Sequence, residues 1–139
     1  MTFFGDTRYW PEGKAVLRVL KQAAGELFRS ALKMPADVYE GPAMNHSYHE
    51  MIIGHGRCFS TVLATLRPEE LPAAGYTADY HMAQFLATQI ALARRGRAVV
   101  AILLDQLEPD SLLALREFFH RAALAVKAAM RKSAAAGVI

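Results

Sequence analysis

The segment NHSYHEMIIGHGRC, residues 45–58, concentrates side chains that could bind a metal ion or take part in catalysis. It contains three of the five histidines, one glutamate and the single cysteine of the chain. Imidazole, carboxylate and thiolate groups are common ligands of transition metals, and they also serve as nucleophiles, acids and bases. The pattern indicates either a site or a helix that carries histidines on its surface, and the positions of these residues on a helix distinguish the two.

His46 and Glu50 lie one helical turn apart, and an H-x-x-x-E pair can supply two ligands to one metal ion. When residues 47–66 are projected as a helix, this pair falls opposite the apolar face. Metal sites in helical bundles use ligands that point inward. An exposed surface pair therefore explains the spacing as well as a metal site does.

His55 falls on the apolar face of the same predicted helix, so we expect it to be buried or to line an internal cleft. Gln89 is a second polar residue inside an apolar stripe, that of a helix predicted over residues 77–95. Two buried polar groups need partners, and each could serve the other. If His55 is a ligand, then His49, His81 or His120 could support it. Cys58 follows His55 by three residues, but the sequence offers no orienting acid, and we expect no catalytic residue here.

Glu117 and His120 match the E-x-x-H spacing by which carboxylate-rich helical bundles bind metal ions. Such bundles need this spacing twice and two further carboxylates, whereas here the pair lies among basic residues. We therefore expect no cofactor, with a transition metal as the alternative.

Two surfaces could bind a macromolecular partner. The first is a basic stripe on the last predicted helix, formed by Arg116, Arg121, Lys127 and Arg131; the second is the aromatic pair Tyr9 and Trp10. The net charge of +3 permits contact with nucleic acid but does not argue for it.

The segments that carry these residues are predicted to be helices. Apolar spacing predicts amphipathic helices over residues 11–34, 47–66 and 77–95, and a long last helix that begins at about residue 108. Residues 98–107 are apolar on all sides and predict a short core helix, although β-branched residues keep a strand possible. We expect an all-α, single-domain bundle of four to five helices over residues 1–139, with an aromatic arm at 1–10 and a frayed tail at 133–139.

The composition narrows the class of protein. Hydrophobic residues make up 53% of the chain, which favours self-association, and no apolar run approaches the roughly 20 residues of a membrane span. A single cysteine fits the reducing cytoplasm. We expect a small cytoplasmic interaction or regulatory protein, not an enzyme, that binds a protein partner as a homodimer. The alternatives are a bundle that binds a metal or small ligand through His55, and a nucleic-acid-associated protein; a membrane partner is not expected.

Overall fold

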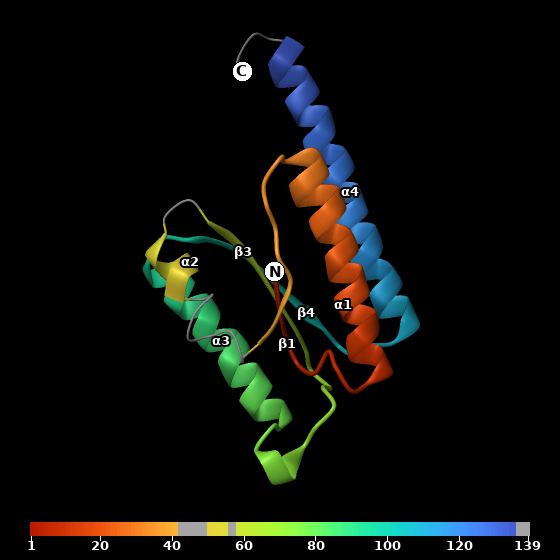
Figure 1. Cartoon of the computed structure of the whole chain (residues 1–139), viewed down its shortest axis with the longest axis vertical. Helices are drawn as coiled ribbons and strands as arrows, with labels where there is room; N and C mark the ends of the chain where they lie inside the picture. The colour runs from red at the N-terminus through yellow and green to blue at the C-terminus, as the bar shows by residue number, and fades with distance from the viewer. Residues whose placement is uncertain (42–49, 56–57, 136–139) are drawn as a thin grey trace.

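A four-stranded parallel sheet forms the centre of the molecule (Figure 1). The computed structural model describes residues 1–41, 50–55 and 58–135. The strands are β1 (Thr2–Phe4), β2 (Tyr39–Gly41), β3 (Phe59–Thr65) and β4 (Ala98–Leu104), in the spatial order β2-β1-β3-β4. The fold is therefore α/β, and the prediction of an all-α helical bundle is wrong.

Helices cover both faces of the sheet. They are α1 (Pro11–Ala23), which continues as the π-helical segment η1 (Ala24–Ala31), α2 (Glu50–Gly54), the 3₁₀ turn η3 (Pro72–Ala74), α3 (Ala78–Arg94) and α4 (Pro109–Ala135). Figure 1 shows α1 and α4 side by side on one face, with α2 and α3 on the other. This arrangement is that of an open, doubly wound sheet.

The alternation of side chains along β1 links the two halves of the core. Phe3 belongs to the cluster that includes Val16 of α1 and Phe119 of α4, whereas the next residue, Phe4, packs with Val62 and Phe85. The rings of Phe4 and Phe85 meet edge to face, with centroids 6.2 Å apart. Each fully buried phenylalanine stabilises the fold by about 1.5–3 kcal/mol, so three residues of β1 hold both helical layers to the sheet.

The predicted helix over 47–66 is wrong for most of its described length. Only Glu50–Gly54 is helical, and Phe59–Thr65 is strand β3, whose last six residues are all buried. A strand covered by helices on both faces shows a continuous apolar run instead of alternation, so its sequence resembles a buried helix.

The predicted core helix over 98–107 is also wrong. Residues Ala98–Leu104 form β4, which pairs only with β3 among the described residues and is partly exposed along its length. The helix is favoured over a strand in the prediction because no candidate partner strand lies nearby in the sequence. Parallel partners are joined through a crossover helix, here α3, so they are never close in sequence.

The N-terminal residues do not form an aromatic arm. Phe3 and Phe4 are buried in the central strand, and only Tyr9 and Trp10 of the four aromatic residues are exposed. The helices expected over 11–34, 77–95 and from about 108 are confirmed, and the last of them continues to Ala135. Across residues 1–41, 50–55 and 58–135, the helices are all too short or too polar to cross a membrane.

Candidate ligand-binding site

A pocket of about 280 Å³ opens at the carboxyl ends of β1, β2 and β3. Its lining comes from the loops that follow these strands and from the first turns of α3. The chain leaves β1 toward β2 and leaves β3 toward β4, so the crossover connections diverge between β1 and β3. Ligands of doubly wound sheets bind at this point, because the diverging loops leave a crevice there.

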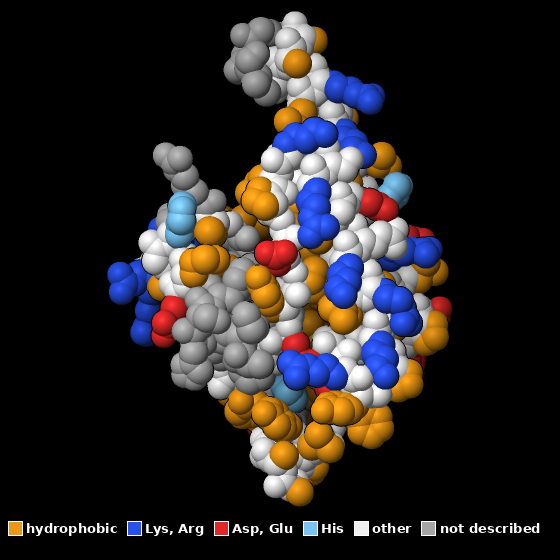
Figure 2. Space-filling model, in the orientation of Figure 1, with side chains coloured by type: hydrophobic (Ala, Val, Ile, Leu, Met, Phe, Trp, Pro, Cys, Tyr) orange, Lys and Arg blue, Asp and Glu red, His pale blue; other side chains and the backbone are white. Residues whose placement is uncertain are grey.

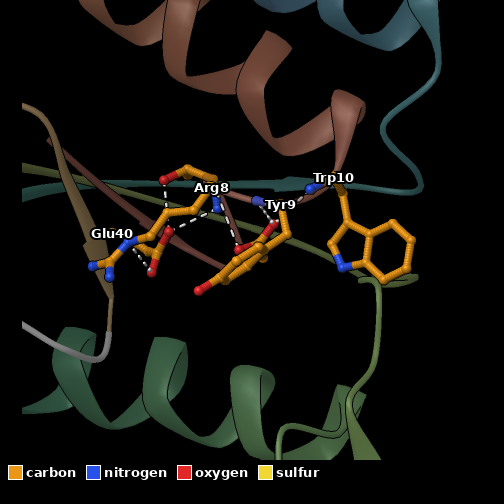
Figure 3. Close-up of polar contacts among 6 residues, drawn as sticks. Arg8, Tyr9, Trp10 and Glu40 are labelled. Carbon is orange, nitrogen blue, oxygen red and sulfur yellow. Dashed lines mark hydrogen bonds and ion pairs between the residues drawn. The ribbon is translucent and has the colours of Figure 1, made fainter.

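The β1–α1 loop is held by the carboxylate of Asp6 (Figure 3). Asp6 accepts hydrogen bonds from the backbone N–H groups of Arg8 at 3.2 Å, Tyr9 at 2.9 Å and Trp10 at 2.9 Å. These donors precede α1, whose first helical residue is Pro11. Asp6 therefore supplies the negative charge that the positive end of a helix attracts.

Glu40, at the end of β2, ties the same loop to the sheet. One carboxylate oxygen accepts from the Thr7 backbone N–H at 2.7 Å and from the Thr7 hydroxyl at 2.6 Å. The other lies 3.3 Å from Nε of Arg8, and Figure 3 shows the guanidinium folded over it. The loop is thus fixed at two points before it presents Tyr9 and Trp10 to the pocket.

The start of α3 is capped in the same way. Glu70 accepts a hydrogen bond from the backbone N–H of Ala78, and the hydroxyl of Thr77 accepts one from Tyr80 at 3.2 Å. The carboxylates of Asp6 and Glu70 therefore lie at the N-termini of α1 and α3, which both begin at this edge of the sheet. A phosphate would meet donors that the chain itself has already bonded.

The walls of the pocket are aromatic and acidic. The rings of Tyr9, Trp10 and Tyr76 are 74%, 36% and 42% exposed. Among the described residues of the lining, three are carboxylates, Asp6, Glu40 and Glu69, and Arg8 is the one cation. The pocket is therefore negative on a chain whose net charge is +3.

His81 lines the pocket from α3 and is 5% exposed. Its Nδ1 atom is buried and has no hydrogen-bond partner in the described part of the chain. Burial lowers the pKa of His81 below its ordinary value of 6.5, against the opposing effect of Glu40, Glu70 and Asp6. The ring stacks on Tyr76 with centroids 6.0 Å apart. At neutral pH the imidazole is uncharged and can donate or accept one hydrogen bond.

The residues of the opening histidine segment are placed only in part. His46 and His49 lie outside the described residues, and Glu50 is exposed at the start of α2. His55 is also exposed, so of the two predicted alternatives, burial and a place in the lining of a cleft, burial is wrong. With Cys58 it lines a second pocket of about 320 Å³, which lies apart from the first. Its role as a ligand stays a prediction.

Gln89 is half-buried and donates a hydrogen bond to the backbone oxygen of Phe85 at 3.2 Å, so its own helix supplies a partner. His120 is exposed, and its Nδ1 lies 3.2 Å from a carboxylate oxygen of Glu26. Hydrogen bonds from Gln22 and then His120 lower the pKa of Glu26. No group of three His, Cys, Asp or Glu residues that could hold a metal ion occurs within residues 1–41, 50–55 and 58–135.

The basic stripe of the last helix is largely exposed on α4: Arg116, Arg121 and Arg131 are open to solvent and Lys127 is half-buried. Figure 2 shows lysine and arginine side chains spread over α1 and α4, with few acidic side chains among them.

Three residues named from the sequence, Tyr9, Trp10 and His81, meet in the first pocket. Sequence reasoning missed its carboxylates and Tyr76, because they lie in or after three different strands, and the all-α prediction contained none of these strands. The one available signal was Asp6, an acidic residue a few positions before a helix that begins with proline. Comparison with known proteins adds no family: no protein-family model, no curated protein and no solved structure matches this chain.

Proposed function

We propose that the protein binds a small organic cation, an amine or a quaternary ammonium ion, in the pocket at the carboxyl ends of β1, β2 and β3. The observation that carries this proposal is the excess of carboxylates in a pocket walled by three aromatic rings. The faces of tryptophan and tyrosine attract cations, by about 0.5–1 kcal/mol at exposed sites.

Within the proposed site, Glu69 is the carboxylate that pairs with the ligand. Asp6 and Glu40 are already bonded to the β1–α1 loop. Glu69 makes no hydrogen bond or ion pair with any described residue. His81 adds a neutral polar group at the pocket wall, where a ligand N–H could supply a partner that the chain does not.

The charge distribution argues against an anionic ligand. Phosphate sites in doubly wound proteins rely on free N–H groups at a helix N-terminus, and here carboxylates of the chain bond to those of the β1–α1 loop and of α3. The volume of about 280 Å³ is below that of sites for drug-sized ligands, which favours a ligand of few atoms.

The proposal assigns binding, because the described residues of the pocket lining include no nucleophile paired with a base. We also place the protein in the cytoplasm; the single cysteine supports a reducing compartment.

The proposal is tested by titrating the ¹⁵N-labelled protein with choline while following backbone amide shifts. The control ligand is the uncharged isostere of choline, in which carbon replaces the ammonium nitrogen, and inorganic phosphate serves as the anion. We expect choline alone to shift residues 5–10 and 76–81. Equal shifts with the isostere, or a response to phosphate at the same residues, would contradict the proposal.

Variants of the residues that line the pocket test the same proposal. Glu69→Gln should weaken choline binding about two- to fivefold, the range for loss of one exposed ion pair. Trp10→Leu should weaken it, and Trp10→Phe should retain part of the affinity because an aromatic face remains. Glu12→Gln, an exposed change on α1 outside the pocket lining, is the matched control and should bind as the parent does.

A second candidate function is binding of a polyanionic macromolecule along α1 and α4. The distribution of lysine and arginine over these two packed helices favours it. Nucleic acid is the partner that we propose to test, since backbone phosphates need only such a surface for non-specific binding.

A further inference from the structure

Among the described residues, no strand pairs with the outer edge of β4, and this edge is the clearest candidate for a binding surface. β4 pairs with β3 on one side and is the last strand of the sheet on the other. Val100 is 36% exposed and Leu103 is 46% exposed, and the strand AVVAILL carries no charged residue. Proteins protect long apolar edge strands with charges, prolines or bulges, or by pairing them with another strand.

The strand at the opposite edge of the sheet, β2, is short. Within the described part of the chain β2 contains three residues, too few to pair with a long partner strand. The seven residues of β4 have no such limit. Pairing is therefore expected at β4 and not at β2.

The direction of the hydrogen-bonding groups on β4 fixes which residues can pair. The carbonyl oxygen of Leu104 accepts a bond from the backbone N–H of Leu66, at the end of β3, at 2.9 Å. Backbone groups of successive strand residues point to alternate sides, so those of Leu104, Ile102 and Val100 face β3. Those of Val99, Ala101 and Leu103 face outward.

This outward set is symmetric about Ala101. If an identical strand approaches in the antiparallel direction, Ala101 lies opposite Ala101 of the second copy, and Val99 lies opposite Leu103. Every outward N–H and carbonyl group then has a partner. The residue on the two-fold axis is alanine, whose small side chain permits close approach.

In this antiparallel arrangement, the charges at one end of β4 are complementary to those at the other end of β4 in the second copy. Arg94, Arg95 and Arg97 precede the strand, and Asp105, Glu108 and Asp110 follow it. Antiparallel pairing brings the basic end of one copy beside the acidic end of the other, whereas parallel pairing would place like charges together. Asp105 already lies 3.6 Å from Arg67. Glu108 and Arg95 are therefore the better pair for a test.

An apolar groove of about 460 Å³ beside the β4 edge adds to the surface that a second copy could bury. It is lined by Val100 of β4 and by Phe118, Ala122 and Val126 of α4, among others. Phe118 is 44% exposed. A two-fold axis perpendicular to the sheet places α4 of both copies on the same face, where these apolar residues can be covered.

We propose that a second copy of this chain binds at the β4 edge, in an antiparallel arrangement centred on Ala101, to give one continuous eight-stranded sheet. The proposal is independent of the ligand pocket, which lies at the carboxyl ends of the other three strands.

The first test is the molar mass of the full chain by sedimentation velocity over a concentration series. We expect a monomer–dimer equilibrium. Leu103→Lys places a charge in the paired edge and should weaken the dimer by about tenfold or more. Met130→Lys makes the same chemical change at an exposed position near the far end of α4 and should leave the dimer intact. Urea unfolding of each variant shows that the fold is kept.

The second test uses charge exchange. Arg95→Glu and Glu108→Lys should each weaken the dimer about two- to fivefold, and the variant that carries both should recover the parental affinity, since each interface again pairs opposite charges. Amide hydrogen exchange gives the register: Val99, Ala101 and Leu103 should gain protection only at concentrations where the dimer forms. A monomer at all concentrations would overturn the proposal, and so would a dimer that Leu103→Lys leaves unchanged.

Discussion

At the scale of single residues, Asp6 occupies the backbone N–H groups that could otherwise bind an anion. Its carboxylate lies where the N–H groups before α1 converge, and it bonds to three of them. The same donors without a carboxylate would form an anion site. The choice of one side chain in the β1–α1 loop therefore decides whether these N–H groups are available to an anion.

Replacing Asp6 with alanine should have two effects. The free energy of unfolding should fall by about 1–2 kcal/mol, as when a helix loses its N-terminal cap. Inorganic phosphate should then bind at the exposed N–H groups and raise the midpoint of thermal unfolding, whereas we expect no such increase for the parent. Asp79→Ala, in the first turn of α3 and outside the pocket lining, is the control. A variant that remains insensitive to phosphate would show that Asp6 is not an internal substitute for an anion.

His81 should make the stability of the fold depend on pH below neutrality. Its folded-state pKa lies below the ordinary 6.5, so the unfolded chain takes up a proton first as the pH falls. His81 therefore imposes no loss of stability above pH 6.5, and the free energy of unfolding decreases as the pH falls from 6.5 toward the folded-state pKa.

Urea unfolding of the parent and of His81→Phe at a series of pH values measures this effect. Phenylalanine keeps an aromatic ring in contact with Tyr76 but cannot titrate, so the variant should lose less stability than the parent over that interval. An identical pH dependence in both proteins would assign the effect to other groups.

At the scale of elements, α1 is packed against the loop that precedes it. A Cβ atom at Gly13 would lie 1.8 Å from the backbone oxygen of Asp6, and backbone atoms cannot move aside as a side chain does. Only glycine allows α1 to begin this close to the pocket loop.

Gly13→Ala should therefore destabilise the fold by about 2 kcal/mol or more and weaken ligand binding, although alanine is the better helix former. Gly25→Ala is the matched control, because a Cβ there meets nothing within 4 Å. That change should raise the free energy of unfolding by up to about 1 kcal/mol. Chemical denaturation of the two variants measures both; a tolerated Gly13→Ala would refute the close approach.

The helices could be predicted from sequence and the strands could not, for a physical reason. The periodic apolar positions of α1, α3 and α4 are local and need no knowledge of the partner. β1 has three residues, β3 is buried on both faces, and β4 pairs through a crossover, so none shows alternation beside a nearby partner. The pocket could not be predicted for the same reason, because Asp6, Glu40 and Glu69 come together only when the order of the strands in the sheet is known.

At the scale of the whole molecule, charge is distributed unevenly. The chain carries a net charge of +3, its pocket carries an excess of carboxylates, and α1 and α4 carry many of its lysines and arginines. An organic cation and a polyanion could therefore bind to different faces without competing.

Binding of nucleic acid should fall steeply with salt, because each neutralised phosphate releases a counterion. Fluorescence anisotropy with a labelled duplex oligonucleotide measures this, and charge reversal at Arg121 or Arg131 should reduce both the affinity and its dependence on salt. Choline should leave the affinity unchanged. Binding that is insensitive to salt, or absent at low salt, would remove nucleic acid as a partner.

The position of β1 in the sheet has a consequence for how the protein is made. Its residues pair with Tyr39–Gly41 on one side and with Val62–Ala64 on the other, so they are synthesised before either partner. Until then Phe3 and Phe4 have no strand to pair with, and the nascent chain exposes two large apolar residues. We expect chaperones that bind short apolar segments of nascent chains to bind there, and release should coincide with synthesis of β3.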